Sequence, residues 1–95
     1  MEERKDYIVN VLESTYEGLH GIEEWVIYKH CTREEVEELS SEDFMSLVDN
    51  YGLEDENENI EIENMSVIYE LDDSYKLDTE LTDLSEIAEK YGTVA

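Results

Sequence analysis

The chain has 95 residues, a formal net charge of −22 and no proline, a composition that predicts one small, strongly acidic domain spanning 1–95. A surface this negative is repelled by nucleic acid and by anionic membranes, which excludes direct nucleic-acid binding and membrane attachment and favours a basic protein surface as the partner. Hydrophobic residues make up 40% of the chain and seven residues are tyrosine, so we expect a folded domain and not a disordered acidic tail.

The cysteine content and the lack of a long apolar run indicate the compartment. The single cysteine, Cys31, cannot form an internal disulfide and is typical of a reducing cytosol. No apolar run approaches the length of a membrane span, and the charged start "MEERKDY" is not followed by the apolar region of a secretory signal. We therefore expect the protein in the cytoplasm of a host cell.

Two strands and a helix are predicted in the first half of the chain. Residues 6–13 and 22–30 are rich in β-branched and aromatic side chains, which is typical of strands, and glycines in the segment between them indicate a turn. Thr32 and Glu35 have the spacing of a capping box, so a helix should begin there. Apolar residues then recur at helical spacing as far as Gly52, which is well placed as the residue after the helix end.

The second half predicts one or two further strands and a second helix. Residues 59–64 alternate apolar and acidic side chains, the pattern of a strand with isoleucines inward and glutamates outward, and 65–71 continue it or return as another strand. Apolar residues from Leu81 to Tyr91 repeat at intervals of three and four, which predicts a helix that Gly92 ends. The order ββαβ(β)α predicts an α+β domain, with two helices on one side of a small antiparallel sheet of three to four strands.

No pattern in the chain is typical of catalysis or of a metal site. The segment from Asp55 resembles a calcium loop, but Ile60 and Ser66 stand where that loop needs glycine and glutamate. His30 and Cys31 are neighbours, and neighbours on a strand point to opposite faces, so they do not form a nucleophile pair. A catalytic carboxylate pair would need a pocket for which so small a domain offers little room. We expect no enzymatic activity, no metal and no cofactor.

The acidic residues are concentrated in one part of the chain. From Glu34 to Tyr75 there are sixteen Asp or Glu side chains and no Lys or Arg, and the stretch "EDENENIEIE" at 54–63 holds six carboxylates. Carboxylates three or four residues apart on a helix have Cβ atoms about 5–6 Å apart, so a folded domain can hold rows of negative charge at fixed spacing. Duplex DNA carries one charge per roughly 1.7 Å, so a net charge of −22 corresponds to roughly eleven base pairs.

This charge pattern predicts a surface that stands in for DNA phosphates. The alternative interpretation is a merely solvated acidic face, which the complete lack of cations over this region disfavours. Crowded carboxylates also disfavour each other's ionised form, so raised pKa values are expected. The predicted partner-binding residues are Glu34, Glu35, Glu37, Glu38, Glu42, Asp43, Asp49, Glu54, Asp55, Glu56, Glu58, Glu61, Glu63, Asp72 and Asp73.

A spaced set of residues at the front of the chain has a counterpart in a known family. The set comprises Tyr7, Ile8, Asn10 and Leu12, then Tyr16, Glu17, Gly18 and Gly21, then Trp25, and finally Glu34, Glu35 and Val36. In this set the chain resembles the N-terminal part of the ArdA antirestriction family, although the gap before Trp25 is longer than the family's and no proline follows that strand. The resemblance implies an acidic DNA mimic, encoded on a phage or other mobile element, that occupies the DNA groove of a type I restriction–modification enzyme.

The sequence therefore predicts a DNA-mimic inhibitor that occupies the basic DNA-binding groove of a host defence enzyme of the restriction–modification type. One alternative is an anti-CRISPR protein that blocks the DNA or PAM site of a Cas effector, since a single small domain also fits a smaller groove. A second alternative is an acidic adaptor that binds a basic protein without competing with DNA. The sequence leaves open whether the inhibitor acts as a monomer or a homodimer.

Overall fold

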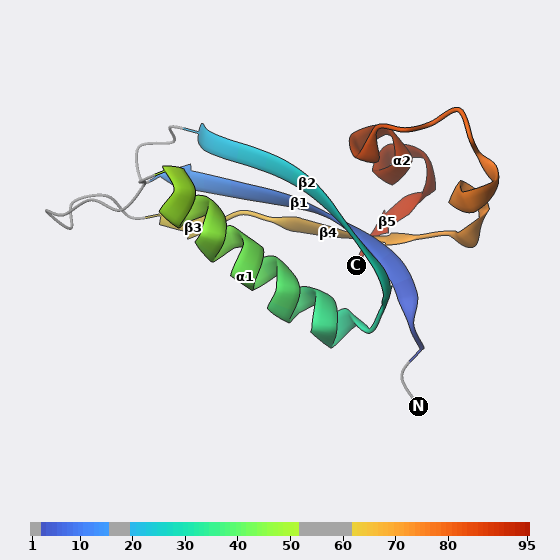
Figure 1. Ribbon diagram of the computed structural model, residues 1–95, viewed down its shortest axis with the longest axis horizontal. Helices are drawn as coiled ribbons and strands as arrows, with labels where there is room; N and C mark the ends of the chain where they lie inside the picture. The colour runs from blue at the N-terminus through green and yellow to red at the C-terminus, as the bar shows by residue number, and fades with distance from the viewer. Residues whose placement is uncertain (1–2, 16–19, 52–61) are drawn as a thin grey trace, which may run out of the picture.

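The protein is built on a five-stranded antiparallel sheet with a helix on each face (Figure 1). The structure is a computed structural model that describes residues 3–15, 20–51 and 62–95. In chain order its elements are β1 (Lys5–Thr15), β2 (His20–Cys31), α1 (Arg33–Tyr51), β3 (Ile62–Asn64), β4 (Val67–Leu71), the 3-10 helix η1 (Asp73–Leu77), α2 (Leu84–Tyr91) and β5 (Gly92–Val94).

β1 is the central strand of the sheet. It pairs with β2 on one side, and on the other side it pairs with β4 near its start and with β3 near its end. β5 pairs with β4, so the strand order is β2-β1-β4-β5 with β3 beside β1. Because β1 has neighbours on both sides and a helix over each face, Ile8, Val9 and Val11 are completely buried.

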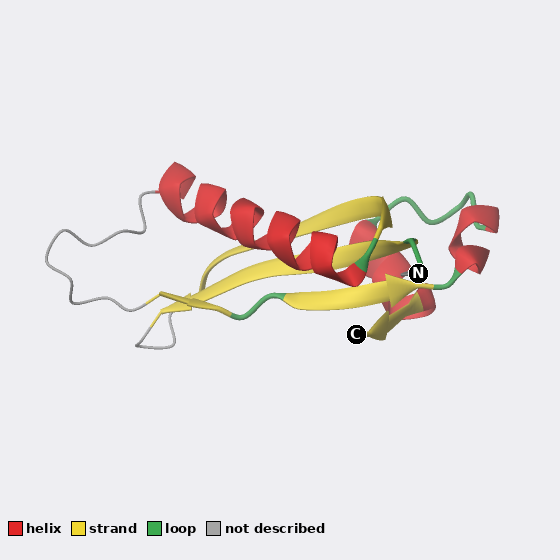
Figure 2. Ribbon diagram, turned by 90° about the horizontal axis from the view of Figure 1, so that it is seen from below, coloured by secondary structure: helices red, strands yellow, loops and turns green. Residues whose placement is uncertain are grey.

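The two helices lie on opposite faces of the sheet, as Figure 2 shows. Successive strand residues point to opposite faces, and β1 is apolar on both. Val9 and Val11 pack against Phe44 of α1, whereas Ile8 packs with Ile87 of α2. The expectation that both helices cover one side was wrong, because a strand that is apolar on both faces needs cover on both.

The start of α1 confirms the predicted capping box. The Thr32 hydroxyl accepts a hydrogen bond from the Glu35 backbone N–H at 3.2 Å, and the Glu35 carboxylate accepts one from the Thr32 N–H at 3.3 Å. The helix then continues without a break through Ser40, whose hydroxyl donates to the Glu37 carbonyl at 3.2 Å. The result is a 19-residue helix that crosses the sheet on one face.

The ends of α2 are set by Asp83 and Gly92. The Asp83 carboxylate accepts from the Ser85 N–H at 3.0 Å, so the helix begins three residues later than the apolar pattern alone indicated. Gly92 caps the other end, as predicted, through a hydrogen bond from its N–H to the Ala88 carbonyl. A Cβ atom at Gly92 would lie 2.5 Å from the Ala88 oxygen and 3.0 Å from the Tyr69 Cβ, so only glycine fits between the helix and β4.

The predicted α+β class with a small antiparallel sheet and two helices is confirmed. The structure adds β5 and folds the predicted turn at 72–78 into η1. Gly52 and the first part of the predicted strand at 59–64 lie outside the described residues. Among the residues that the structure describes, no helix is long and apolar enough to cross a membrane.

Candidate partner-binding surface

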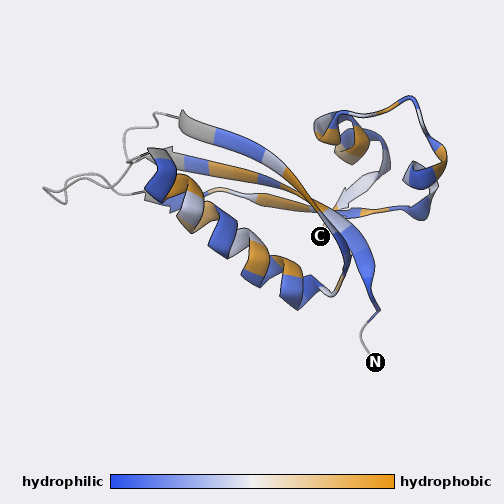
Figure 3. Ribbon diagram, viewed as in Figure 1, coloured by the Kyte–Doolittle hydropathy of each residue, from blue (hydrophilic) through white to orange (hydrophobic). Residues whose placement is uncertain are grey.

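One side of α1 faces away from the sheet and carries a row of exposed carboxylates. The 3.6-residue period places Glu34, Glu38, Glu42 and Asp49 on the side of the helix opposite Val36, which is completely buried. At 1.5 Å per residue the row spans about 22 Å. We call these four residues the acidic ridge. The alternation of hydrophilic and hydrophobic segments along α1 is visible in Figure 3.

The acidic ridge carries uncompensated charge. Its neighbour Glu37 pairs with Arg33 at 3.2 Å, but among the described residues no Lys or Arg lies within ion-pair distance of the four ridge carboxylates. The first half of the ridge borders an open hollow of about 720 Å³, lined by Glu34, Glu37, Glu38, Ser41 and Glu42. A cationic side chain of another molecule could enter this hollow and meet several carboxylates at once.

Two predicted residues on the flanks of α1 have partners within the protein. The Glu35 carboxylate forms an ion pair with Arg4 at 2.7 Å, and its pKa is lowered chiefly by the Thr32 backbone N–H. Asp43 accepts a hydrogen bond from the Tyr28 hydroxyl. Burial, together with this hydrogen bond to a carboxylate, raises the pKa of Tyr28. Asp43 thus joins α1 to β2, and Glu35 joins the start of α1 to the residue before β1, so both carboxylates are less available to a partner than the ridge.

Three other predicted residues lie away from the ridge. Asn64 of β3 lines a hollow against α1, so the neighbouring Glu63, which is exposed, points to the opposite face of the sheet. Asp72 caps η1 by accepting from the Ser74 N–H at 2.9 Å, an interaction that lowers the pKa of Asp72. Asp73 forms an ion pair with Lys76 at 3.7 Å.

The predicted set therefore does not form one continuous surface among the described residues. The structure brings Glu34, Glu37, Glu38, Glu42 and Asp49 together on α1 and separates Glu63, Asp72 and Asp73 from them. The predicted residues Glu54, Asp55, Glu56, Glu58 and Glu61 lie outside the described residues.

Sequence reasoning missed Glu24. This exposed residue lies on β2 opposite Val11, and Val11 faces α1, so Glu24 adds a negative charge on the α1 side of the sheet. It escaped notice because it precedes the acidic region by ten residues. The period of two along β2, which puts Glu24 on the same face as Val26 and Tyr28, was the signal that could have found it.

The expected rise in carboxyl pKa values is wrong for the four carboxylates whose shift is resolved. The pKa values of Asp6, Glu35, Asp72 and Asp78 are all lowered. Each of these carboxylates accepts hydrogen bonds from backbone or side-chain donors, and donors stabilise the ionised form. Local donors thus outweigh the crowding of like charges at these positions.

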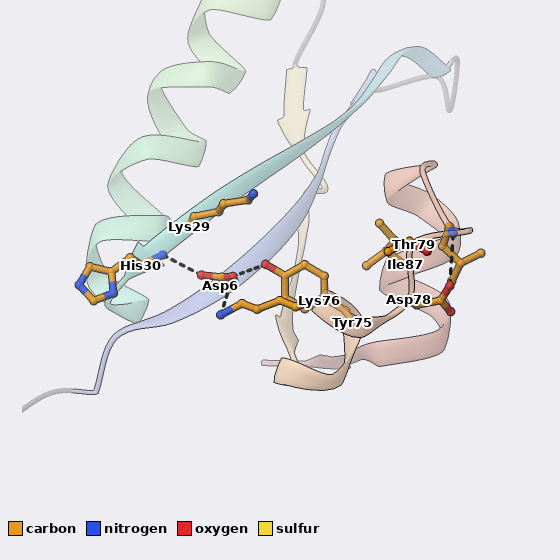
Figure 4. A pocket seen from close by; sticks show the side chains of 9 residues that line it. Asp6, Lys29, His30, Tyr75, Lys76, Asp78, Thr79 and Ile87 are labelled. Carbon is orange, nitrogen blue, oxygen red and sulfur yellow. Dashed lines mark hydrogen bonds and ion pairs between the residues drawn. The ribbon is translucent and has the colours of Figure 1, made fainter.

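Cationic side chains gather at the end of the sheet where β1 begins (Figure 4). There an open pocket of about 690 Å³ is lined by Asp6, Lys29, His30, Tyr75, Lys76, Asp78, Thr79, Leu81 and Ile87. The buried Asp6 accepts from the His30 backbone N–H at 2.9 Å and from the Tyr75 hydroxyl, and Lys76 lies 3.8 Å away. Burial alone would raise the pKa of Asp6, but these donors outweigh it and the pKa is lowered.

In this pocket Asp6 has a structural role, because it links three elements of the fold. Its contacts join β1 to η1 and hold the end of β2, where His30 adopts a φ of 55°, a backbone conformation that is uncommon outside glycine. The His30 side chain is exposed, whereas the Cys31 thiol is buried and donates to the Lys29 carbonyl at 3.3 Å. The two side chains thus occupy different environments.

Within the described ranges, no group of three or more His, Cys, Asp or Glu side chains is arranged to hold a metal ion. Comparison with protein-family models, with curated proteins and with solved structures finds no match to this chain. The candidate site therefore stands on the geometry and charge of the acidic ridge.

Proposed function

We propose that the protein is a DNA mimic that inhibits a nucleic-acid-binding host defence enzyme by occupying its basic groove. The observation that carries the proposal is the acidic ridge, with four exposed carboxylates on one rigid helix and no ion-pair partner among the described residues. Like charges in a row disfavour a compact fold, so a row without compensating cations is more useful to binding than to stability.

The ridge has the length of part of a DNA strand and somewhat more than half of its charge. One strand of duplex DNA carries a phosphate about every 3.4 Å of axis, which amounts to roughly six or seven charges over the ridge's length of about 22 Å. The ridge supplies four, and Glu24 lies on the same side of the sheet, whereas the charge of the neighbouring Glu37 is compensated by Arg33. This side of the protein therefore resembles one strand of a short duplex more closely than a complete one.

Placement on a helix suits this role. Backbone hydrogen bonds fix the Cβ positions of the ridge residues relative to one another, so little backbone entropy is lost when a groove closes around them. Rows of Lys and Arg in the groove would attract the ridge over a Debye length, about 8 Å at physiological ionic strength. Such complementarity mainly raises the association rate, and binding should weaken as salt is added.

Competition with DNA is the test. The partners to use are a purified type I restriction methyltransferase, which the resemblance to the ArdA family favours, and a purified DNA-targeting CRISPR effector, which the alternative favours. The protein's apparent Kd for each would be measured at increasing concentrations of a specific duplex. We expect the apparent Kd for at least one of these enzymes to rise in proportion to duplex concentration, and enzyme pre-loaded with DNA to resist inhibition.

Two results would contradict the proposal. A stable complex of the protein, the enzyme and DNA together would show that the groove remains open to DNA, and would favour the acidic adaptor. Failure to bind either enzyme at low salt, where electrostatic attraction is strongest, would remove both kinds of defence enzyme as targets.

A further inference from the structure

The sheet has one long edge with no strand beside it. β2, with 12 residues, is paired with β1 on one side only, and among the described residues nothing pairs with its other side (Figure 1). The opposite edge is β5, which is only three residues long. A long free edge presents a row of unpaired N–H and C=O groups that another strand can bind.

The middle of this edge is apolar and only partly covered. Residues 25–28 (Trp, Val, Ile, Tyr) are all half-buried, whereas Ile8 and Val9, their neighbours on β1, are completely buried. Val26 packs towards α1, and Trp25 packs towards α2. The helices thus cover the two faces of β2, and its edge is the uncovered part.

We propose that a second copy of this chain binds at this edge, with the two β2 strands antiparallel and Val26 on the two-fold axis. In such a dimer the axis is perpendicular to the sheet, and residues directly opposite one another must point to the same face. Centring the pair on Val26 places Glu23 opposite Lys29 of the second copy and Trp25 opposite its Ile27. By symmetry each pair occurs twice.

Charge selects this register. Centring the pair on Glu24 would place the two Glu24 carboxylates, which repel each other, directly opposite one another. Centring it on Trp25 would place no residues of opposite charge opposite one another. Centring it on Ile27 would place Lys29 opposite Trp25, which has no charge. It would also place Glu24 opposite His30, where the φ of 55° departs from strand geometry. Lys29 is exposed and has no ion-pair partner among the described residues, so it is available to a carboxylate of the second copy.

The net charge makes the dimer dependent on salt. Two copies with a formal net charge of −22 repel each other, and salt screens this repulsion more effectively than it screens directly opposed pairs. Association should therefore strengthen as salt is added, the opposite of what is expected for binding to a basic groove. The dimer is independent of the proposed function, and either can fail without the other.

Sedimentation equilibrium tests the proposal directly. At about 0.15 M salt and protein concentrations up to about 0.5 mM, we expect the mass to rise from 11.2 kDa towards twice that value. Trp25 is the only tryptophan, so its emission should shift to shorter wavelength as the dimer forms and the edge is covered. A chain that remains a monomer up to this concentration at every salt concentration would overturn the proposal.

Charge exchange tests the register. Lys29→Glu and Glu23→Lys each place like charges opposite one another in a homodimer, so each variant alone should raise the dimer Kd by about tenfold or more. An equimolar mixture of the two variants should associate again as a heterodimer. One chain then has Glu at both positions 23 and 29 and the other has Lys at both, so each of the two pairs joins Glu to Lys. Thermal unfolding of each variant at low concentration verifies that it folds. Variants that associate as the wild type does, or a mixture that stays monomeric, would overturn this arrangement.

Discussion

Replacing Glu13 by methionine should stabilise the protein. Glu13 lies on β1 with its side chain completely buried, and neither carboxylate oxygen has a hydrogen-bond partner among the described residues. A buried polar group without a partner costs about 1–3 kcal/mol, and more if it is charged. Methionine is also unbranched and similar in length, so it can fill the space without strain.

The two oxygens set the size of the expected effect. At the lower end of that range, two unsatisfied oxygens correspond to about 2 kcal/mol in the free energy of unfolding. In a domain of this size, about 1 kcal/mol shifts the melting temperature by about 4–8 °C. We therefore expect Glu13→Met to melt about 8–16 °C higher than the wild type.

The assay is urea and thermal unfolding, followed by circular dichroism and by the fluorescence of Trp25. Glu24→Met is the matched control, because it also removes one negative charge from a strand of the same sheet, but at an exposed position. A general relief of charge repulsion would stabilise both variants equally. If the free energy of unfolding rises no more in Glu13→Met than in Glu24→Met, or falls, then the Glu13 carboxylate is not an unsatisfied buried group.

Three further predictions concern the fold. The lowered pKa of Asp6 means that its contribution to stability is complete above the unfolded pKa of about 3.9 and is lost as pH falls through the folded pKa. Unfolding measured from pH 7 to pH 2 should therefore show Asp6→Asn to be much less stable than the wild type at pH 7, with the difference shrinking in acid; a constant difference would contradict this. Gly92→Ala should destabilise by about 2 kcal/mol or more in urea, because its Cβ would collide with the Ala88 carbonyl, whereas the exposed Thr93→Ala should have little effect. The wild type should melt at a higher temperature as salt rises from about 0.01 M to about 1 M, since repulsion is then screened, and a melting temperature unchanged by salt would argue against strong self-repulsion.

Local features were predictable from the sequence. The capping box of Thr32 and Glu35 involves two residues that are close in the chain, and the structure has it as predicted. The helical spacing that places Glu34, Glu38, Glu42 and Asp49 on one side of α1 also depends on the helix alone. The end of α2 at Gly92 was also predictable, because the hydrogen bond from its N–H to the Ala88 carbonyl joins residues that are close in the chain.

Features that depend on distant parts of the chain were not predictable in this way. The placement of the helices on opposite faces follows from both faces of β1 being buried, which becomes clear only when β2 and β4 are seen on either side of it. The three residues of β5 form a strand only because β4 pairs with them. Glu63 is separated from the ridge by the register of β3 against β1, which no local pattern specifies. Glu13 continues an apolar strand in the sequence, and only the packing shows that its carboxylate is buried.

Binding of a defence enzyme through the acidic ridge is tested most directly by two variants of equal charge. The ridge variant carries Glu38→Gln, Glu42→Gln and Asp49→Asn, and the control carries the same number of changes at the exposed residues Glu80, Glu86 and Glu89, each to Gln. Each variant removes three negative charges from a net charge of −22. The measurement is the Kd for whichever defence enzyme the DNA competition identifies. We predict that the ridge variant raises this Kd at least about tenfold, mainly through a slower association rate, and that the control changes it less than about twofold. Equal losses from the two variants would show that the acidity acts diffusely and would contradict a binding site on α1.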